Sequence, residues 1–259
     1  MTWHNYWRRS ETHRMSLREY CLIPDWPAPK RVRALQTTRN GGISAMPYAS
    51  LNLGSHVGDV PLAVAHNRQL LAPLLPSEPV WLNQVHGVVV VNADAAACLP
   101  QADGCVAFHP GAVCVVMTAD CLPVLLCDDR GGVVGAAHAG WRGLCDGIIE
   151  STVRAMNVPP DTLMAWLGPA IGPQAFEVGA EVRAAFIAQQ PEAAAAFVPG
   201  MAGKWYVDIY QLARQRLQAL GITRIYGGDL CTYADHARFY SYRRDGITGR
   251  MGAFIWLEG

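Results

Sequence analysis

The sequence lacks the features that would mark a membrane-spanning, secreted or nucleic-acid-binding protein. No apolar run approaches the ~20 residues that a membrane-spanning helix needs. The first residues, MTWHNYWRRSETHRMS, contain no apolar segment of a secretory signal. Lys and Arg together number 21, as do Asp and Glu, so the net charge provides no bulk attraction for nucleic acid or membranes. We therefore expect a cytoplasmic protein without nucleic-acid or membrane partners.

The cysteine and histidine patterns of common metal proteins are also missing. The eight cysteines form no CxxC pair, which argues against a zinc knuckle or a thioredoxin-like motif. There is no HxH pair for a multinuclear copper centre, and no HxE…PCxxC signature of the zinc deaminases. In a cytosolic chain of this length, buried thiols or metal ligands are expected rather than disulfides.

The composition is that of an ordinary folded enzyme-sized chain. It is 51% hydrophobic and 16% charged, and it contains no internal repeat, low-complexity linker or break in composition. The sequence predicts a leader over residues 1–30, outside the core, and a single domain over residues 31–259. Met15 is an alternative start, because residues 1–14 show no structural pattern.

Strands and helices alternate along the chain. Apolar runs rich in Val and Leu predict strands at 88–92, 112–117, 122–127, 132–137, 163–167, 222–227 and 252–257. Helical spacing predicts helices at 144–156, 179–189 and 208–220, the last of them with Asp208 as N-cap and Gly221 as its end. This mixture favours a layered α/β sandwich over a helix bundle.

Three segments each place one soft or borderline metal ligand at the end of an apolar run. They are LNQVHG, MTADCLPVLL and AAHAGWRG, and the ligands are His86, Cys121 and His138. Histidine and cysteine together favour Zn²⁺ or Cu²⁺, and three protein ligands leave a fourth position open for catalysis. The spacing alone matches no zinc finger, so buried structural residues are an alternative. Another is a Cys121 nucleophile with a histidine base that Asp120 orients.

Other residues are candidates for holding an anion or a base. Arg39 lies in a Gly-rich turn, Arg142 at the expected start of a helix, and Arg243 in SYRRDG. Guanidinium groups bind phosphate in two-point fashion, so these arginines are a candidate phosphate clamp. We add to the substrate site His56, Gln84 and Tyr242.

The order of several motifs resembles the YfiH-like family, also called the laccase-domain or multicopper polyphenol oxidoreductase family. The resemblance runs from about residue 35 to the C-terminus. The motifs are TTRNGG, PYASLNLGSHVGD, NRQLL, WLNQVHG, TADCLPVLLCD, AAHAGWRG, WLGPAIGPQAFEVG and FYSYRRDGITGR. It implies a single α/β sandwich with a mixed sheet, related to a cysteine-hydrolase-like toxin fold. It also implies a metal site at His86, Cys121 and His138.

The family resemblance further implies a zinc-dependent purine nucleoside enzyme. Such an enzyme phosphorolyses adenosine, inosine and methylthioadenosine and deaminates adenosine, with a nucleoside and phosphate as partners. The cofactor is Zn²⁺, with Cu²⁺ as the alternative, and Asp120 is a candidate proton shuttle in the chemistry of His86, Cys121 and His138. We expect a monomer or a small homo-oligomer. Two other functions stay open: a Cys–His amidase acting on a peptidoglycan precursor, and a copper-dependent polyphenol oxidase.

Overall fold

The computed structural model describes residues 16–96 and 98–259, and it is built around two β-sheets. The smaller one is antiparallel throughout, with four strands in the order β1 (Cys21–Leu22), β2 (Val32–Thr37), β13 (Met251–Leu257) and β5 (Val113–Thr118). It therefore brings the C-terminal strand between segments from the first half of the chain.

The larger sheet has six strands and is mixed. Their order is β12 (Arg224–Gly227), β8 (Leu163–Leu167), β6 (Leu122–Asp128), β7 (Val134–Ala139), β4 (Gly104–Ala107) and β3 (Val90–Asn92). The pairs at the two edges, β12–β8 and β3–β4, are parallel, while the central pairs are antiparallel. The predicted α/β sandwich with a mixed sheet is confirmed.

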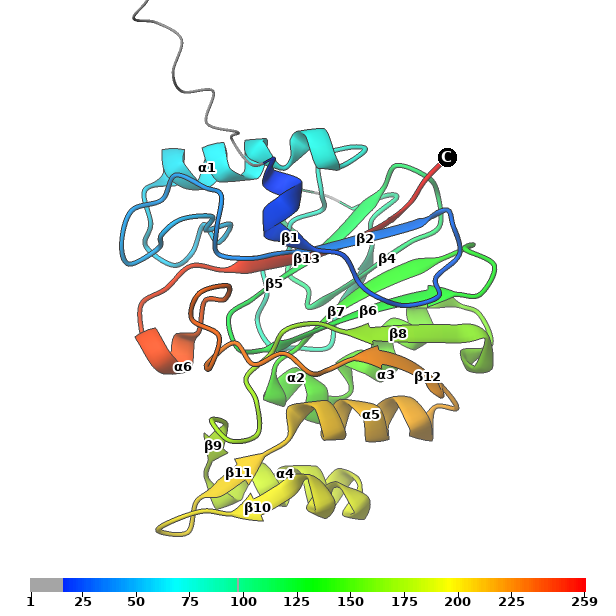
Figure 1. Ribbon diagram of the computed structural model, residues 1–259. Coiled ribbons are helices and arrows are strands. Elements are labelled where there is room, and N and C mark those ends of the chain that lie inside the picture. Colours follow the sequence, from blue (N-terminus) through cyan, green and yellow to red (C-terminus); the bar gives the residue numbers. More distant parts are fainter. Residues whose placement is uncertain (1–15, 97) are drawn as a thin grey trace, which may run out of the picture.

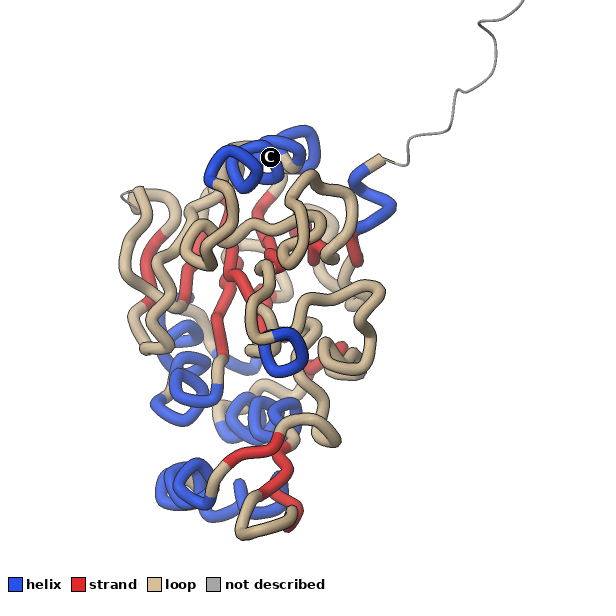
Figure 2. The backbone as a smooth tube through the Cα atoms, turned by 90° about the vertical axis from the view of Figure 1, so that its left-hand side faces the viewer, coloured by secondary structure: helices blue, strands red, loops and turns tan. Residues whose placement is uncertain are grey.

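The two sheets pack face to face, and helices cover their outer faces (Figures 1 and 2). Fully buried side chains from both sheets fill the space between them, among them Val116, Ile255, Leu125 and Ala136. The outer face of the smaller sheet is covered by α1 (Pro61–Leu70) and the short 3₁₀ helix Ala72–Leu74. The outer face of the larger sheet is covered by α2 (Trp141–Asp146), α3 (Ile148–Met156) and α5 (Ile209–Ala219). Burial of these apolar faces is the main source of stability.

A small antiparallel sheet lies beyond the helices of the larger sheet (Figure 1). Its strands run in the order β10 (Phe197–Pro199), β11 (Trp205–Val207) and β9 (Glu177–Val178), and α4 (Ala180–Gln189) packs beside them. The remaining elements are the 3₁₀ helices Leu17–Tyr20, Pro160–Thr162 and Pro191–Ala196 and the short helix α6 (Tyr242–Asp245).

Most of the predicted elements are observed, but one predicted helix differs in extent, and β2, β4 and α1 are among the elements that were not predicted. The strand predicted at 163–167 is observed over those residues, and Asp208 caps α5 by accepting a hydrogen bond from the Gln211 amide at 2.9 Å. The helix predicted at 144–156 begins earlier and is split into α2 and α3 at Gly147. The break occurs because Gly147 has a left-handed backbone with a φ of 99°, a conformation that glycine adopts without a steric penalty.

The leader predicted over residues 1–30 divides into two parts. Residues 1–15, including the alternative start at Met15, lie outside the described residues. The 3₁₀ helix Leu17–Tyr20 and β1 belong to the fold instead, because Cys21 and Leu22 pair with Thr37 and Gln36 of β2. None of the described helices is long and apolar enough to cross a membrane.

Candidate metal centre

The side chains of His86, Cys121 and His138 meet at one end of the space between the two sheets. Cys121 directly precedes β6. His138 is a residue of the neighbouring strand β7, where it pairs with Pro123 of β6. Their ligand atoms all lie within 4.8 Å of one another, with 3.7 Å between Cys121 Sγ and His86 Nε2. The structure therefore brings together three residues whose spacing in the sequence matches no known pattern.

A buried carboxylate holds both histidines in place. Asp103, which precedes β4 and is fully buried, accepts a hydrogen bond from His138 Nδ1 at 2.8 Å. It also accepts from the amides of Val85, His86 and Gly87 at 3.2, 2.9 and 2.7 Å. Because Nδ1 of His138 donates to Asp103, Nε2 is the ring nitrogen that faces Cys121 and that would bind a metal after losing its proton. Asp103 was not among the predicted site residues.

The loop that carries His86 has a special backbone. His86 has a φ of 63°, a left-handed conformation that is uncommon outside glycine. The three amides donating to Asp103 hold this turn. A further close approach occurs at Gly140, where a Cβ atom would lie 2.7 Å from His86 Cδ2 and 3.0 Å from Cys121 Sγ. A side chain at Gly140 would therefore displace two of the three ligands.

The electrostatics of the cluster favour a thiolate. Burial by itself raises the pKa of Cys121, but the positive charge and hydrogen bonds of His138 and His86 more than offset it and lower the pKa to about 6. Burial lowers the pKa of His138, and the Cys121 thiolate and Asp103 together raise it to about 9. Burial likewise works against ionisation of Asp103, yet the hydrogen bonds of His138 and the backbone amides hold its pKa below the usual value.

The three residues open into a cavity of about 310 Å³. Met117 and Thr118 at the end of β5 form part of its lining, so the cavity lies between the sheets. His56, Gln84, Tyr242 and Arg250 complete its polar lining. Tyr242 is 59% exposed and lies at the rim, where an aromatic face is available to a planar ligand. Three of the predicted substrate residues, His56, Gln84 and Tyr242, thus line the same cavity as the candidate metal ligands.

Gln84 is already fully engaged by the protein. Its Nε2 donates to the Met117 carbonyl at 2.8 Å, and its Oε1 accepts from the Met117 amide at 2.7 Å. The side chain therefore fixes the end of β5 against the loop that carries His86. This arrangement leaves Gln84 a positioning role in the cavity rather than direct readout of a ligand.

Asp120 neighbours Cys121 in sequence, but its carboxylate is used elsewhere. One oxygen accepts from Thr232 Oγ1 at 2.6 Å, and the other accepts from the Arg243 amide at 2.7 Å. Asp120 is buried and is not among the residues that line the cavity. The geometry favours a structural link between the start of β6 and the 232–243 segment over the predicted proton shuttle.

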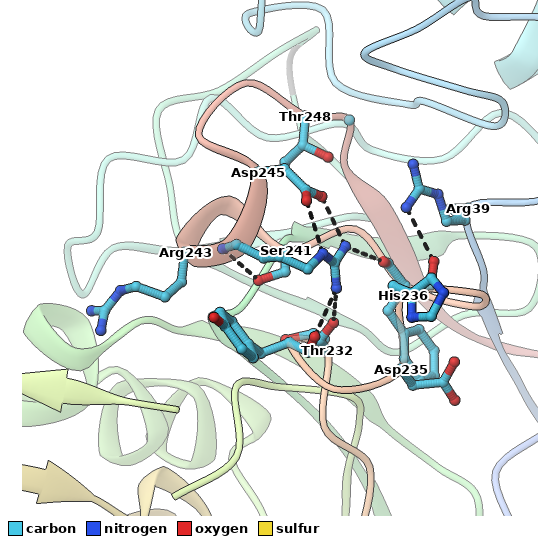
Figure 3. Close-up of polar contacts among 12 residues, drawn as sticks. Arg39, Thr232, Asp235, His236, Ser241, Arg243, Asp245 and Thr248 are labelled. Atoms are coloured by element: carbon cyan, nitrogen blue, oxygen red, sulfur yellow. Dashed lines mark hydrogen bonds and ion pairs between the residues drawn. The ribbon is translucent and has the colours of Figure 1, made fainter. Parts of the chain in front are cut away.

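The three arginines of the predicted phosphate clamp do not line this cavity. Arg39 donates to the carbonyls of Ala49 and His236, as Figure 3 shows for His236. Arg142 is exposed and stacks on Trp141 with 4.5 Å between the guanidinium carbon and the ring centroid.

The side chain of the third arginine, Arg243, extends away from Thr232, Ser241 and Asp245 (Figure 3). It donates to the carbonyl of Glu177 at 2.8 Å. The arginine that does line the cavity is Arg250, which lies in the FYSYRRDGITGR motif but was not singled out.

The donor set fits a borderline metal ion. Two imidazole nitrogens and one thiolate are ligands that Zn²⁺ and Cu²⁺ accept, and hard oxygen-binding cations do not prefer them. The carboxylate behind His138 and the close packing at Gly140 leave the three ligands preorganised. Three protein ligands that border a cavity also leave room for an exogenous ligand.

Comparison with known proteins shows extensive similarity. Residues 33–258 match the family described as multi-copper polyphenol oxidoreductase laccase. A purine nucleoside phosphorylase of Pseudomonas aeruginosa is 57% identical over 238 residues, covering 92% of this chain and 98% of that protein. The purine nucleoside phosphorylase YfiH of Escherichia coli is 55% identical over 239 residues, covering 91% and 98%. A crystal structure of a Neisseria meningitidis protein matches with a TM-score of 0.90 at 52% identity, covering 93% of this chain and 100% of that one.

Proposed function

This chain belongs to the multi-copper polyphenol oxidoreductase laccase family, which includes the YfiH proteins, and we propose that it is a metal-dependent purine nucleoside phosphorylase. Its substrates are adenosine, inosine and methylthioadenosine together with phosphate, and it also deaminates adenosine. The names of relatives that match almost the whole chain support an enzyme of this kind. The observation that carries the proposal is the convergence of His86, Cys121 and His138 at a cavity of about 310 Å³.

In this proposal the three side chains hold Zn²⁺, with Cu²⁺ as the alternative metal. Such an ion stabilises developing negative charge and lowers the pKa of a water it binds. The protein's own contribution is orientation. Asp103 fixes the ring of His138 and the turn of His86, while Gln84 fixes the end of β5.

Phosphorolysis transfers the ribose from a base to phosphate. A phosphate oxygen forms a bond to C1′ as the C1′–N9 bond breaks, and the bonding electrons leave with the purine, which takes up a proton. The cavity must hold both reactants in line and exclude water, since water would otherwise replace phosphate. We place the purine against the exposed ring of Tyr242 at the rim, with its ribose directed into the cavity.

Deamination is the second reaction of the proposed enzyme. Water adds at C6 of adenine, the C6–N6 bond breaks, and ammonia leaves with the proton it needs. The HxE…PCxxC arrangement of the zinc deaminases is missing. In this proposal the reaction therefore uses the same His86–Cys121–His138 cavity.

The test is product analysis with purified, zinc-loaded protein and adenosine, with and without phosphate. The proposal predicts adenine and ribose-1-phosphate only when phosphate is present, and inosine in either case, part of it cleaved further to hypoxanthine when phosphate is present. All of these products should disappear after chelation and return with Zn²⁺. If no product forms at any metal loading, the nucleoside assignment is refuted.

A second function, a Cys–His amidase acting on a peptidoglycan precursor, is supported by one observation. The Cys121 thiol lies 3.7 Å from His86 Nε2, and its pKa is lowered to about 6 mainly by His138 after burial has acted against it. A thiolate beside a histidine is the arrangement of thiol hydrolases. The amidase predicts metal-independent activity that alkylation blocks, whereas the phosphorylase loses activity on chelation.

The copper oxidase function suggested by the family's name is the weakest of the three. Multinuclear copper centres need many histidines, and this chain has eight with no HxH pair. Within residues 16–96 and 98–259, one group of three suitable side chains is found. Metal analysis with three or more coppers per chain would favour the oxidase instead.

A further inference from the structure

The backbone, the aliphatic stem and the guanidinium of Arg250 all contact the protein, and these contacts hold the side chain at the cavity. Its amide donates to Asn52 Oδ1 at 2.8 Å, and its carbonyl accepts from the Leu53 amide at 3.1 Å. The stem packs so closely on Gly54 that a Cβ there would lie 2.8 Å from Arg250 Cγ. Its Nη1 donates to the carbonyls of Thr248 and Gly249 at 3.0 Å each. The guanidinium is thus preorganised before any ligand arrives.

No carboxylate of the described residues forms an ion pair with this guanidinium. Five other arginines do have such partners: Arg33, Arg216, Arg224, Arg238 and Arg244. Burial lowers the pKa of Arg250, and the more distant charges of Cys121 and Asp120 only partly counter this. A half-buried cation without an anionic partner is costly, and an anionic ligand reduces that cost.

Two further groups at the cavity suit an oxyanion. Thr118 is 2% exposed, lines the cavity, and its Oγ1 has no hydrogen-bond partner among the described residues. His56 lies at the rim, where burial and the charges of Arg250, Arg68 and His138 lower its pKa and favour the neutral imidazole. Together they offer a guanidinium, a hydroxyl and an imidazole N–H as donors.

We propose that Arg250, Thr118 and His56 form the subsite that binds inorganic phosphate, beside the metal ligands in the same cavity. The inference rests on the phosphorolysis proposed above and replaces the expected clamp of Arg39, Arg142 and Arg243. A planar guanidinium binds two phosphate oxygens at once, and the hydroxyl of Thr118 reaches a third. A divalent metal more than neutralises the Cys121 thiolate, so the loaded cavity attracts a dianion.

The test is phosphate binding to the full-length, zinc-loaded protein without nucleoside. Isothermal titration in a buffer free of other oxyanions measures the dissociation constant. Arg250→Gln should weaken phosphate binding by at least about 30-fold, because it removes a charged partner from a partly buried contact. Arg250→Lys should recover only part of this loss. Native affinity in Arg250→Gln would overturn the proposal.

Two variants guard against misfolding and general charge effects. Arg130→Gln removes an exposed arginine in the turn at the opposite end of β6 and β7, and it should bind phosphate as the native protein does. Thr118→Val keeps the shape of the side chain and removes the unpartnered hydroxyl, so phosphate binding should weaken while the thermal midpoint is kept. If Thr118→Val binds phosphate with native affinity, Thr118 does not belong to the subsite.

Two further experiments are needed. One tests whether the subsite prefers phosphate to a carboxylate, and the other distinguishes failure of the subsite from failure of the proposed phosphorylase. Acetate at the same concentrations should not displace phosphate, and equal displacement would make this a carboxylate site and contradict the proposal. If phosphate binds through Arg250 but adenosine is not turned over, the subsite stands and the phosphorylase fails. If adenosine is phosphorolysed by Arg250→Gln with a native KM for phosphate, the phosphorylase stands and the subsite fails.

Discussion

The two ends of strand β6 carry two cysteines with opposite chemistry. Cys127, near the end of the strand, is fully buried between the sheets, and burial raises the pKa of its thiol to about 12. Cys121, just before the strand, lies beside two imidazoles, and their influence overcomes burial and lowers the pKa to about 6. Six residues along one strand thus separate an inert core thiol from a thiolate.

The difference shows that the chemistry of each cysteine depends on the side chains that surround its end of β6, and not on the strand itself. At the far end, Asp128 accepts from the amides of Gly132 and Val133 and closes the turn to β7. At the near end, Asp103 also accepts from backbone amides, but it adds the bond to His138. A buried carboxylate at a strand end thus closes a turn in one place and orients a candidate metal ligand in the other.

The largest expected effect is obtained by removing each cysteine in turn. Cys121→Ala should abolish metal binding and lower the phosphorolysis rate at least about 1000-fold, because several kcal/mol of charge stabilisation are lost. Cys127→Ala should keep the activity and cost about 1 kcal/mol of unfolding free energy through a small cavity. Initial rates, metal content and urea denaturation measure these effects. Equal rates for the two variants would remove the contrast between the strand ends.

The two buried carboxylates provide the next comparison. Asp103→Asn should weaken zinc binding about 10- to 100-fold, since it disturbs the partner of a metal-ligating histidine. Asp128→Asn should lower the thermal midpoint but leave zinc affinity unchanged. Competition with a chromophoric chelator measures the affinities. If both variants bind zinc as the native protein does, Asp103 acts only on folding.

A smaller effect is expected from adding one methyl group at Gly140, beside the candidate metal site, or at Gly132, in the turn at the other end of β7. Gly140→Ala should reduce zinc affinity and activity about tenfold, because its Cβ would meet His86 and Cys121 at 2.7 and 3.0 Å. Gly132→Ala adds the same atom at 3.4 Å from the Asp128 carboxylate, an ordinary contact, and should change neither. Unchanged zinc binding in Gly140→Ala would mean that the ligands adjust at little cost.

The smallest effect is a shift in a pH profile. In metal-free protein, alkylation of Cys121 should increase as the pH rises through about 6, since a lowered pKa leaves the reactive thiolate present above that value. Cys127 should stay unmodified until the protein unfolds. Mass spectrometry after timed alkylation follows both residues. A midpoint near 9 for Cys121 would show that the imidazoles do not stabilise its thiolate.

Much of the scaffold can be predicted from the sequence, because buried strands have a simple signature. The run at 163–167 and the Asp208 cap lie where the pattern places them. The strands at 32–37 and 104–107 were not predicted, and both become strands by pairing with distant segments. Such pairing is decided by tertiary contacts, which local propensity does not contain.

The three residues that cluster, His86, Cys121 and His138, were predicted from their places at strand ends and from family resemblance, whereas the residues that support them were not. Asp103 stands in QADG, directly before an apolar run, a signal that reads equally well as a turn. Arg250 lies seven residues after Arg243 in the same motif, and the adjacent arginines were the more conspicuous choice. Which arginine meets the cavity depends on Asn52 and Gly54, some 200 residues earlier, and no local pattern reports that contact.

The central claim is that the single His86–Cys121–His138 site supports phosphate-dependent cleavage of purine nucleosides. The most direct measurement titrates metal-free protein with Zn²⁺ and records ribose-1-phosphate production at each step. The account predicts a rate that rises from near zero and becomes constant at one zinc per chain, as the one three-ligand group within residues 16–96 and 98–259 requires. Full activity without metal, or a rate that continues to rise to three or more metals per chain, would contradict it.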